Sequence, residues 1–276
     1  MKTPLITLDG IHTKLETYNL TGSIKDRMVT FIINQAEKRG ELKKGQQIIE
    51  VTSGNTGIAL AAISAQRGYK FTAIMPESMS LQRRQMMQAF GANLILTPAK
   101  EDIVGAISKY KELVGSTPSA YLPKQFENPD NIMAHQLGLG PEILADVPQV
   151  DVFVAGAGTG GTLIGVAKAL PKTTKIIAVE PAESAVLSGG KPGIHGIQGI
   201  GEGFIPHILE ENRHLIDEII IIKTKDAIRA SHDLAQKNGV LVGISSGANF
   251  LAAQSLKNRF RHIVTVFPDR GERYFK

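Results

Sequence analysis

The feature that most limits the fold of this chain is the alternation of two kinds of apolar segment. Short runs rich in β-branched residues are separated by longer segments with helical periodicity. Strands that alternate with helices form parallel sheets covered by helices on both faces, so we predict an α/β fold. The expected strands are 47–51, 70–75, 93–96, 150–155, 175–179, 218–222 and 261–267. The expected helices are 26–38, 58–67, 80–90, 101–113, 161–170, 224–237 and 248–257.

The length of 276 residues is enough for about two domains. Hydrophobic residues make up 42% and charged residues 21%, which excludes global disorder. We expect a break between two αβ halves near the turn-rich segment 128–131.

Charge and cysteine usage exclude several classes of function. The net charge of +5 is spread along the chain, and no run is long enough for a nucleic-acid-binding tail. The absence of cysteine excludes disulfides, thiolate metal sites and cysteine nucleophiles. We assign no metal ligand. No apolar run approaches the roughly 18 residues of a membrane span, and Pro4 and Asp9 interrupt any signal-peptide core, so we expect a cytoplasmic protein.

A glycine-rich turn follows the strand expected at 150–155. Gly156, Gly158 and Gly161 fit the dinucleotide pattern G-x-G-x-x-G, and Glu180 ends the next strand about 20 residues later, where it would bind a ribose hydroxyl. An NAD-dependent enzyme is therefore one interpretation.

The detail of the same turn favours a single phosphate. Residues 158–162 read GTGGT, which is denser in glycine than the dinucleotide pattern needs and adds the hydroxyls of Thr159 and Thr162. Successive backbone N–H groups at a helix N-terminus can surround one phosphate dianion. A tight turn that binds no ligand is the alternative.

Lys25 lies at the start of the helix expected at 26–38. The positive end of a helix macrodipole disfavours a cation, so a neutral amine suits this position better. That environment is typical of a lysine that forms a Schiff base. An ordinary surface lysine beside Asp26 and Arg27 is the alternative.

Two further strand-to-helix turns are rich in hydroxyl groups. Thr52, Ser53, Asn55 and Thr56 offer hydroxyls, an amide and backbone N–H groups to an anion such as a carboxylate. Simple N-capping needs one such residue and not four. Residues 242–249 repeat the pattern with two adjacent serines.

The ordered set of motifs resembles the cysteine synthase family of pyridoxal-phosphate enzymes. The resemblance extends from Thr3 to Tyr274 and rests on the segments KLE, GSIKDR, EVTSGNTGIALA, MPESMS, QFENPDN, GPEI, GAGTGGT, VEP, GIQGIG, GFIP, GISSGA and PDRGERY. It implies the fold-type II architecture, similar to the tryptophan synthase β-subunit, with two three-layer αβα domains and mostly parallel sheets. The smaller, carboxylate-binding domain is expected over 30–134, and the larger, phosphate-binding domain over 1–29 and 135–276.

The resemblance also implies roles for individual residues. Lys25 would carry pyridoxal 5'-phosphate and act as the catalytic base. The remaining cofactor contacts would come from Asn55, Gly158, Thr159, Gly160, Gly161, Thr162 and Ser245. The substrate would be bound by Thr52, Ser53, Gly54, Thr56, Gln125 and Gly201. Ser246 is the alternative to Ser245 at the pyridine nitrogen.

The implied reaction is β-replacement. O-acetyl-L-serine and sulfide would give L-cysteine and acetate through an α-aminoacrylate intermediate. The resemblance further implies a homodimer that can bind the C-terminal tail of a serine acetyltransferase.

Two other functions are compatible with the sequence. A sibling β-replacement enzyme would use serine, phosphoserine or cysteine to make cystathionine, lanthionine or a diamino acid. Glu202, at a position usually small and apolar in the family, and the pair Gly138-Leu139 motivate that alternative. If Glu202 points into the site, its carboxylate would repel an anionic nucleophile. A non-catalytic paralogue that binds a partner protein is the third hypothesis, which the intact Lys25 argues against.

Overall fold

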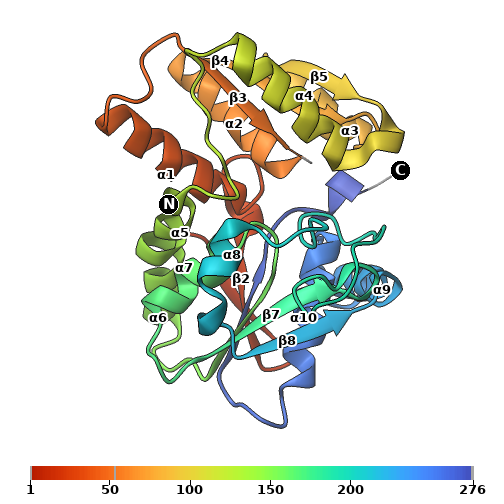
Figure 1. The fold of residues 1–276 in the computed structure, drawn as a ribbon. Helices are drawn as coiled ribbons and strands as arrows, with labels where there is room; N and C mark the ends of the chain where they lie inside the picture. The colour runs from red at the N-terminus through yellow and green to blue at the C-terminus, as the bar shows by residue number, and fades with distance from the viewer. Residues whose placement is uncertain (1, 53, 275–276) are drawn as a thin grey trace. The chain divides into compact units, whose positions relative to one another are not determined.

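The computed structural model describes residues 2–52 and 54–274 (Figure 1). Its contacts divide the chain into two compact units. Unit 1 comprises residues 1–24 and 125–276, and unit 2 comprises residues 25–124. The assignment of a substrate-carboxylate domain to 30–134 stays a prediction.

Unit 1 is built on a six-stranded sheet with the order β1-β2-β9-β6-β7-β8. Its strands are β1 (Leu5–Leu8), β2 (Ile11–Leu15), β6 (Val152–Gly156), β7 (Lys175–Pro181), β8 (Glu218–Ile222) and β9 (Ile263–Phe267). Only the β1–β2 pair is antiparallel among these strands. The helices are α5 (Pro129–Ala134), α6 (Gly140–Asp146), α7 (Gly161–Ala169), α8 (His207–Glu211), α9 (Thr224–Asn238) and α10 (Ile244–Ser255), with a π-helical stretch at His135–Leu139.

The two faces of this sheet are covered by different helices. Along β6, Phe153 and Ala155 join one hydrophobic cluster with α6 and α7, while Val152 and Val154 join another with α9 and α10. Successive strand residues point to opposite faces, so a continuously apolar strand indicates burial on both sides. Unit 1 is therefore a three-layer αβα unit.

Unit 2 repeats this arrangement around a smaller parallel sheet with the order β3-β4-β5. Its elements are β3 (Gln47–Val51), β4 (Lys70–Pro76), β5 (Asn93–Thr97), α1 (Lys25–Lys38), α2 (Asn55–Arg67), α3 (Leu81–Ala89) and α4 (Asp102–Ser116). One hydrophobic cluster joins the sheet to α1 and α2, and a second cluster with Ile49 and Ile74 joins it to α4. The α/β fold with mostly parallel sheets is confirmed in both units.

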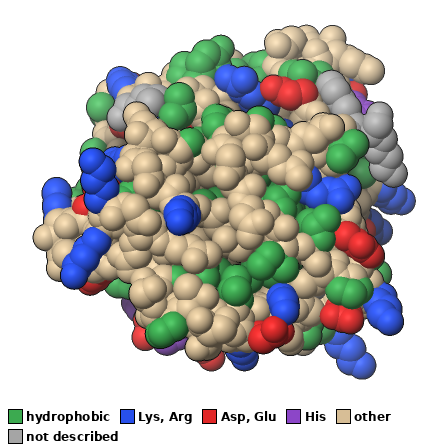
Figure 2. All heavy atoms as spheres, turned by 90° about the horizontal axis from the view of Figure 1, so that it is seen from above, with side chains coloured by type: hydrophobic (Ala, Val, Ile, Leu, Met, Phe, Trp, Pro, Cys, Tyr) green, Lys and Arg blue, Asp and Glu red, His purple; other side chains and the backbone are tan. Residues whose placement is uncertain are grey.

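Short helices complete the structure. They are η1 (Glu16–Tyr18), η2 (Ala99–Glu101), η4 (Ala182–Ser184), η5 (Arg213–Leu215) and η6 (Gly271–Tyr274). Across the described part of the chain, every helix is too short or too polar to span a membrane. On the face drawn in Figure 2, the Lys and Arg side chains are scattered and do not gather into one patch.

The expectation of a break near 128–131 stays a prediction. Asn128 caps α5, because its Oδ1 accepts the N–H of Asp130 at 2.9 Å and Pro129 occupies the first helical turn. The unit boundary lies a few residues earlier, between Lys124 and Gln125. Turn-forming residues also begin helices, so composition alone did not separate a linker from a helix cap.

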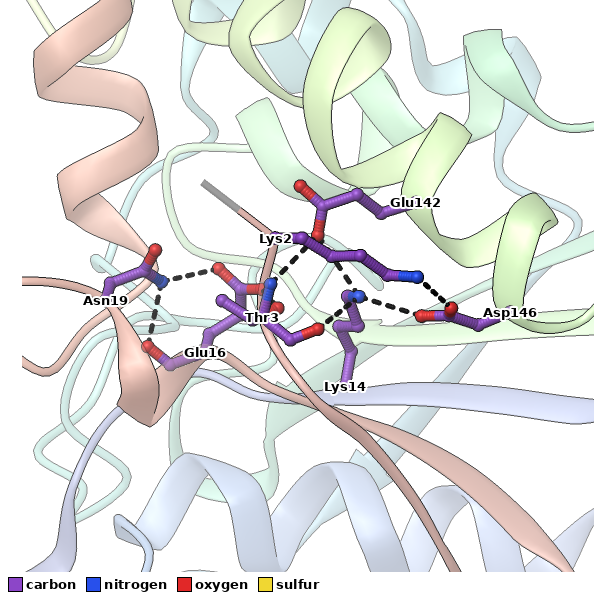
Figure 3. A network of polar contacts seen from close by, with 7 residues as sticks. All are labelled: Lys2, Thr3, Lys14, Glu16, Asn19, Glu142 and Asp146. Carbon is purple, nitrogen blue, oxygen red and sulfur yellow. Dashed lines mark hydrogen bonds and ion pairs between the residues drawn. The ribbon is translucent and has the colours of Figure 1, made fainter.

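A buried lysine ties the N-terminal strands of unit 1 to α6 (Figure 3). The side chain of Lys14 in β2 is fully buried, and its Nζ lies 3.1 Å from both Glu142 and Asp146 and donates to the carbonyl oxygen of Thr3 at 2.7 Å. Burial alone would raise the pKa of Asp146, but hydrogen bonds from Lys2 and Lys14 outweigh it and hold that pKa below its ordinary value. Glu16 extends this network through Thr3 Oγ1 at 2.7 Å.

We expect Lys14→Met to lower the free energy of unfolding by about 2–3 kcal/mol at pH 7, because two partly buried carboxylates lose their shared partner. The loss should shrink as the pH falls below about 4, where protonation removes the carboxylate charge that Lys14 stabilises. Urea unfolding followed by far-UV circular dichroism measures both effects. Lys2→Met is the control: Lys2 contacts the same Asp146 but is 61% exposed, so its change should be much smaller. Equal losses for the two variants would contradict this account.

Candidate active site

A glycine-rich loop at residues 156–162, the glycine loop, joins β6 to α7. Gly160 precedes α7 with φ +91°, a left-handed conformation that favours glycine. A Cβ at position 158 would lie 2.5 Å from the carbonyl oxygen of Gly199, which leaves no room for any side chain there. The loop therefore presents bare backbone at the N-terminus of α7.

Asn131 of α5 supports this loop. Its Nδ2 donates to Thr159 Oγ1 at 3.0 Å and to the carbonyl oxygen of Gln125 at 2.8 Å. A Cβ on Gly161 would lie 1.8 Å from its Oδ1. Asn131 thus brings three predicted site residues together, although the sequence analysis used it only as part of a turn. Its position inside the QFENPDN motif was the signal that could have marked it.

The glycine loop suits an anion such as phosphate. The first turn of α7 contains no acidic residue, and the unbonded N–H groups of a helix N-terminus attract negative charge. Two threonines add hydroxyls: Thr159 Oγ1 accepts the Gly161 N–H at 3.4 Å, and Thr162 Oγ1 lies 3.3 Å from His135 Nε2. Donors and shape both fit one phosphate group.

Gly201 lies next to the glycine loop. Its N–H donates to the carbonyl oxygen of Ala157 at 3.0 Å. It has φ +67°, and a Cβ there would lie 2.6 Å from Pro181. The structure therefore places this predicted substrate residue beside the loop that is expected to bind the cofactor. Its substrate contact stays a prediction.

The segment between η4 and α8, which contains Gly201, forms no helix or strand. The apolar side chains of Ile197 and Ile200 pack against the unit and are 0% and 5% exposed. Ile194 of the same segment is 95% exposed. The buried pair anchors the part of the segment that approaches the glycine loop.

The two adjacent serines lie in the first turn of α10, which begins earlier than the expected residue 248. Ser245 is 3% exposed and Ser246 is fully buried. Within the described residues, Ser246 Oγ has no hydrogen-bond partner. The choice between them for a ring nitrogen stays a prediction.

Lys25 is the first residue of α1 and is half-buried. The turn before it is attached to the C-terminal segment of unit 1, because the N–H of Ile24 donates to the carbonyl oxygen of Pro268 at 2.8 Å and Arg273 donates to the carbonyl oxygen of Thr21. Lys25 therefore directly follows a hydrogen-bonded turn and lies at the first position of α1, the positive end of the helix dipole.

The second anion-binding candidate belongs to unit 2. Thr52 and residues 54–57, the threonine loop, lie between β3 and the first turn of α2. Thr52 Oγ1 accepts the N–H groups of Gly54 and Gly57, both at 3.1 Å. Asn55 begins α2 and Thr56 is 3% exposed. Ser53 lies outside the described residues.

Glu180 does not have the role that a dinucleotide site requires. It is 2% exposed, and its Oε2 accepts the N–H of Leu187 at 2.9 Å. Its Oε1 accepts the N–H of Ser188 at 2.9 Å and the hydroxyl of the same serine. The carboxylate organises the turn after β7, which argues against the NAD interpretation.

Glu202 lines a small cavity beside the glycine loop. Ala157, Glu180, Ser184 and Gly201 also line it, and its volume of about 20 Å³ has room for about one water molecule. Whether Glu202 meets the substrate stays a prediction.

Comparison with known proteins decides the family. The family model described as "Pyridoxal-phosphate dependent enzyme" matches residues 1–269. The chain belongs to this family. A curated cysteine synthase of Staphylococcus aureus is 47% identical to it over 272 residues, which is 96% of this chain and 87% of the relative.

Solved structures of this pyridoxal-phosphate enzyme family agree with the fold. Cysteine synthase from Entamoeba histolytica has a TM-score of 0.93 and 45% identity, covering 99% of this chain and 86% of that one. O-acetylserine dependent cystathionine beta-synthase from Helicobacter pylori has a TM-score of 0.94 and 41% identity, and the match covers 100% of this chain and 94% of that one. The expected fold-type II architecture and the dependence on pyridoxal 5'-phosphate are confirmed.

We expect Gly158→Ala to weaken the binding of pyridoxal 5'-phosphate by at least about tenfold, because the new Cβ would meet the backbone of Gly199 and displace the loop. Equilibrium dialysis of the cofactor, followed by its visible absorbance, measures the affinity. Gly115→Ala in α4 is the control, since nothing lies within 4 Å of a Cβ there. Unchanged affinity in Gly158→Ala would show that the loop does not hold the phosphate.

Proposed function

We propose that this enzyme converts O-acetyl-L-serine and sulfide into L-cysteine and acetate. The observation that carries the proposal is the 47% identity, over 96% of the chain, to a curated cysteine synthase. Two anion-binding loops and a lysine at a helix N-terminus supply the groups that this reaction needs.

The binding roles follow from the local structure. The glycine loop would hold the cofactor phosphate through its backbone N–H groups, assisted by Thr159 and Thr162. The threonine loop would bind the α-carboxylate of the substrate at the N-terminus of α2, together with Gln125. Asn55 and Ser245 would contact the ring of the cofactor. These assignments are supported by loop shape and donor content.

Lys25 would perform the proton transfers. The bound cofactor supplies an electron-withdrawing ring that acidifies the substrate Cα–H bond. The Cα proton moves to Nζ of Lys25, and acetate leaves from Cβ. Sulfide then adds to Cβ, and Nζ returns the proton to Cα. The helix N-terminus supports these steps because it disfavours a permanent positive charge on Nζ.

We also propose that the enzyme is a cytoplasmic homodimer, and that the C-terminal carboxylate of a serine acetyltransferase binds the threonine loop in place of the substrate. The support is the resemblance of the motifs to cysteine synthases and the match between a peptide carboxylate and this loop.

Lys25→Ala should lower the turnover of O-acetyl-L-serine with sulfide by at least about a thousandfold, because the proton acceptor is removed. A discontinuous assay of L-cysteine measures the rate. Lys38→Ala, at the exposed other end of α1, should leave it unchanged. Substantial turnover by Lys25→Ala, or faster turnover with an amino-acid thiol than with sulfide, would contradict the proposal.

The adjacent serines should respond differently to substitution. Ser245→Ala should shift the visible absorbance of the bound cofactor and lower turnover. Ser246→Ala should change neither and should keep or raise thermal stability, because it removes a buried hydroxyl without a partner in the described structure. The reverse pattern would assign the ring contact to Ser246.

A further inference from the structure

Arg83 is a buried cation that takes no part in the proposed reaction. It belongs to α3 in unit 2 and is 2% exposed. Arginine is almost never buried to this extent unless it is paired. Ser80 caps its helix, because Ser80 Oγ accepts the Arg83 N–H at 3.4 Å. The backbone of Arg83 is thus held at the first turn of α3.

The side chain of Arg83 lies directly against the threonine loop. A Cβ at position 54 would be 2.4 Å from its Cδ, 2.7 Å from its Nε and 3.0 Å from its Cζ. Gly54 also has φ +154°, so glycine is required there both by the backbone and by the arginine. One turn further along α3, Met87 Sδ would be 2.6 Å from a Cβ on Gly57. One face of α3 therefore supports both ends of the turn.

The contact places a permanent positive charge beneath an anion-binding loop. A guanidinium stays protonated in proteins, and a buried charge acts more strongly on a nearby anion than an exposed one does. Glu50 in β3 is a buried carboxylate of the same unit, and its Oε1 accepts the N–H of Val51 at 3.0 Å. Because this unit buries a charge of each sign, the effect of Arg83 on a bound anion has to be measured against a neutral ligand.

We propose that Arg83 is a positioning and specificity residue of the threonine loop. Its stem fixes the backbone at Gly54, and its charge makes the loop select a carboxylate over an uncharged group of the same shape. The inference rests on the proposed function in one respect, namely that this loop binds the α-carboxylate of the amino-acid substrate.

The test compares two ligands that differ only at the carboxylate. L-serine and L-serinamide are titrated into the holoenzyme, and the change in visible absorbance of the bound cofactor gives each dissociation constant. Arg83→Gln should raise the dissociation constant of L-serine by about tenfold or more and that of L-serinamide by less than about threefold. Arg83→Lys, which keeps the charge, should recover most of the affinity for L-serine.

Two further variants separate the explanations. Arg84→Gln removes a charge from the same helix and should leave both affinities within about twofold of the wild type. Arg83→Met removes the charge but keeps an unbranched stem against Gly54, and it should reproduce the selective loss of L-serine affinity. It also keeps the test decisive if Arg83→Gln does not fold.

Each contrary result has a distinct meaning. Equal losses for L-serine and L-serinamide would show a purely structural role for Arg83. An equal effect of Arg84→Gln would show a dependence on net charge alone. Both results overturn the inference and leave the proposed function intact. If the wild type binds the two ligands equally, the carboxylate role of the loop fails, and the inference fails with it.

Discussion

The positive end of the helix dipole is the electrostatic feature on which the proposed chemistry depends. Parallel strands end at one edge of a sheet, and the helix that follows each strand begins there with its positive end. The glycine loop before α7 and the threonine loop before α2 are two instances, one in each unit. Both suit an anion without a metal ligand. In the proposed reaction, Lys25 would use the same positive helix end for the opposite purpose, because it disfavours a cation there.

The sequence predicted what periodicity and spacing encode. β3 and β8 begin and end at the expected residues, and α7 ends one residue before its expected end. The glycine loop could be predicted because closely spaced glycines indicate a backbone segment that has no room for side chains. β1 and β2 were missed: they are short, and the second depends on burying Lys14, a residue whose charge signals exposure in a linear reading.

Contacts between segments that are distant in the chain could not be predicted from the sequence. Asn131 contacts Thr159 and Gly161, which lie about 30 residues further along the chain. The sequence around Asn131 does not reveal that its side chain points into the glycine loop. The sequence around Arg83 does not reveal that its side chain lies against Gly54, which comes almost 30 residues earlier. Glu180 matched a ribose-binding position by spacing, yet its carboxylate is occupied by the turn that follows β7. Spacing finds the position of a side chain, and the fold decides its partner.

The close approach of Gly158 to the Gly199 carbonyl has a consequence for engineering. The space between the two backbones is smaller than one methyl group needs, so neither segment can be redesigned alone. A longer or shorter loop grafted between η4 and α8 would have to reproduce the path of residues 199–201 before it altered anything else. Substitutions intended to change which nucleophile the enzyme accepts are therefore best confined to side chains. The backbone of that segment is best treated as part of the proposed phosphate site.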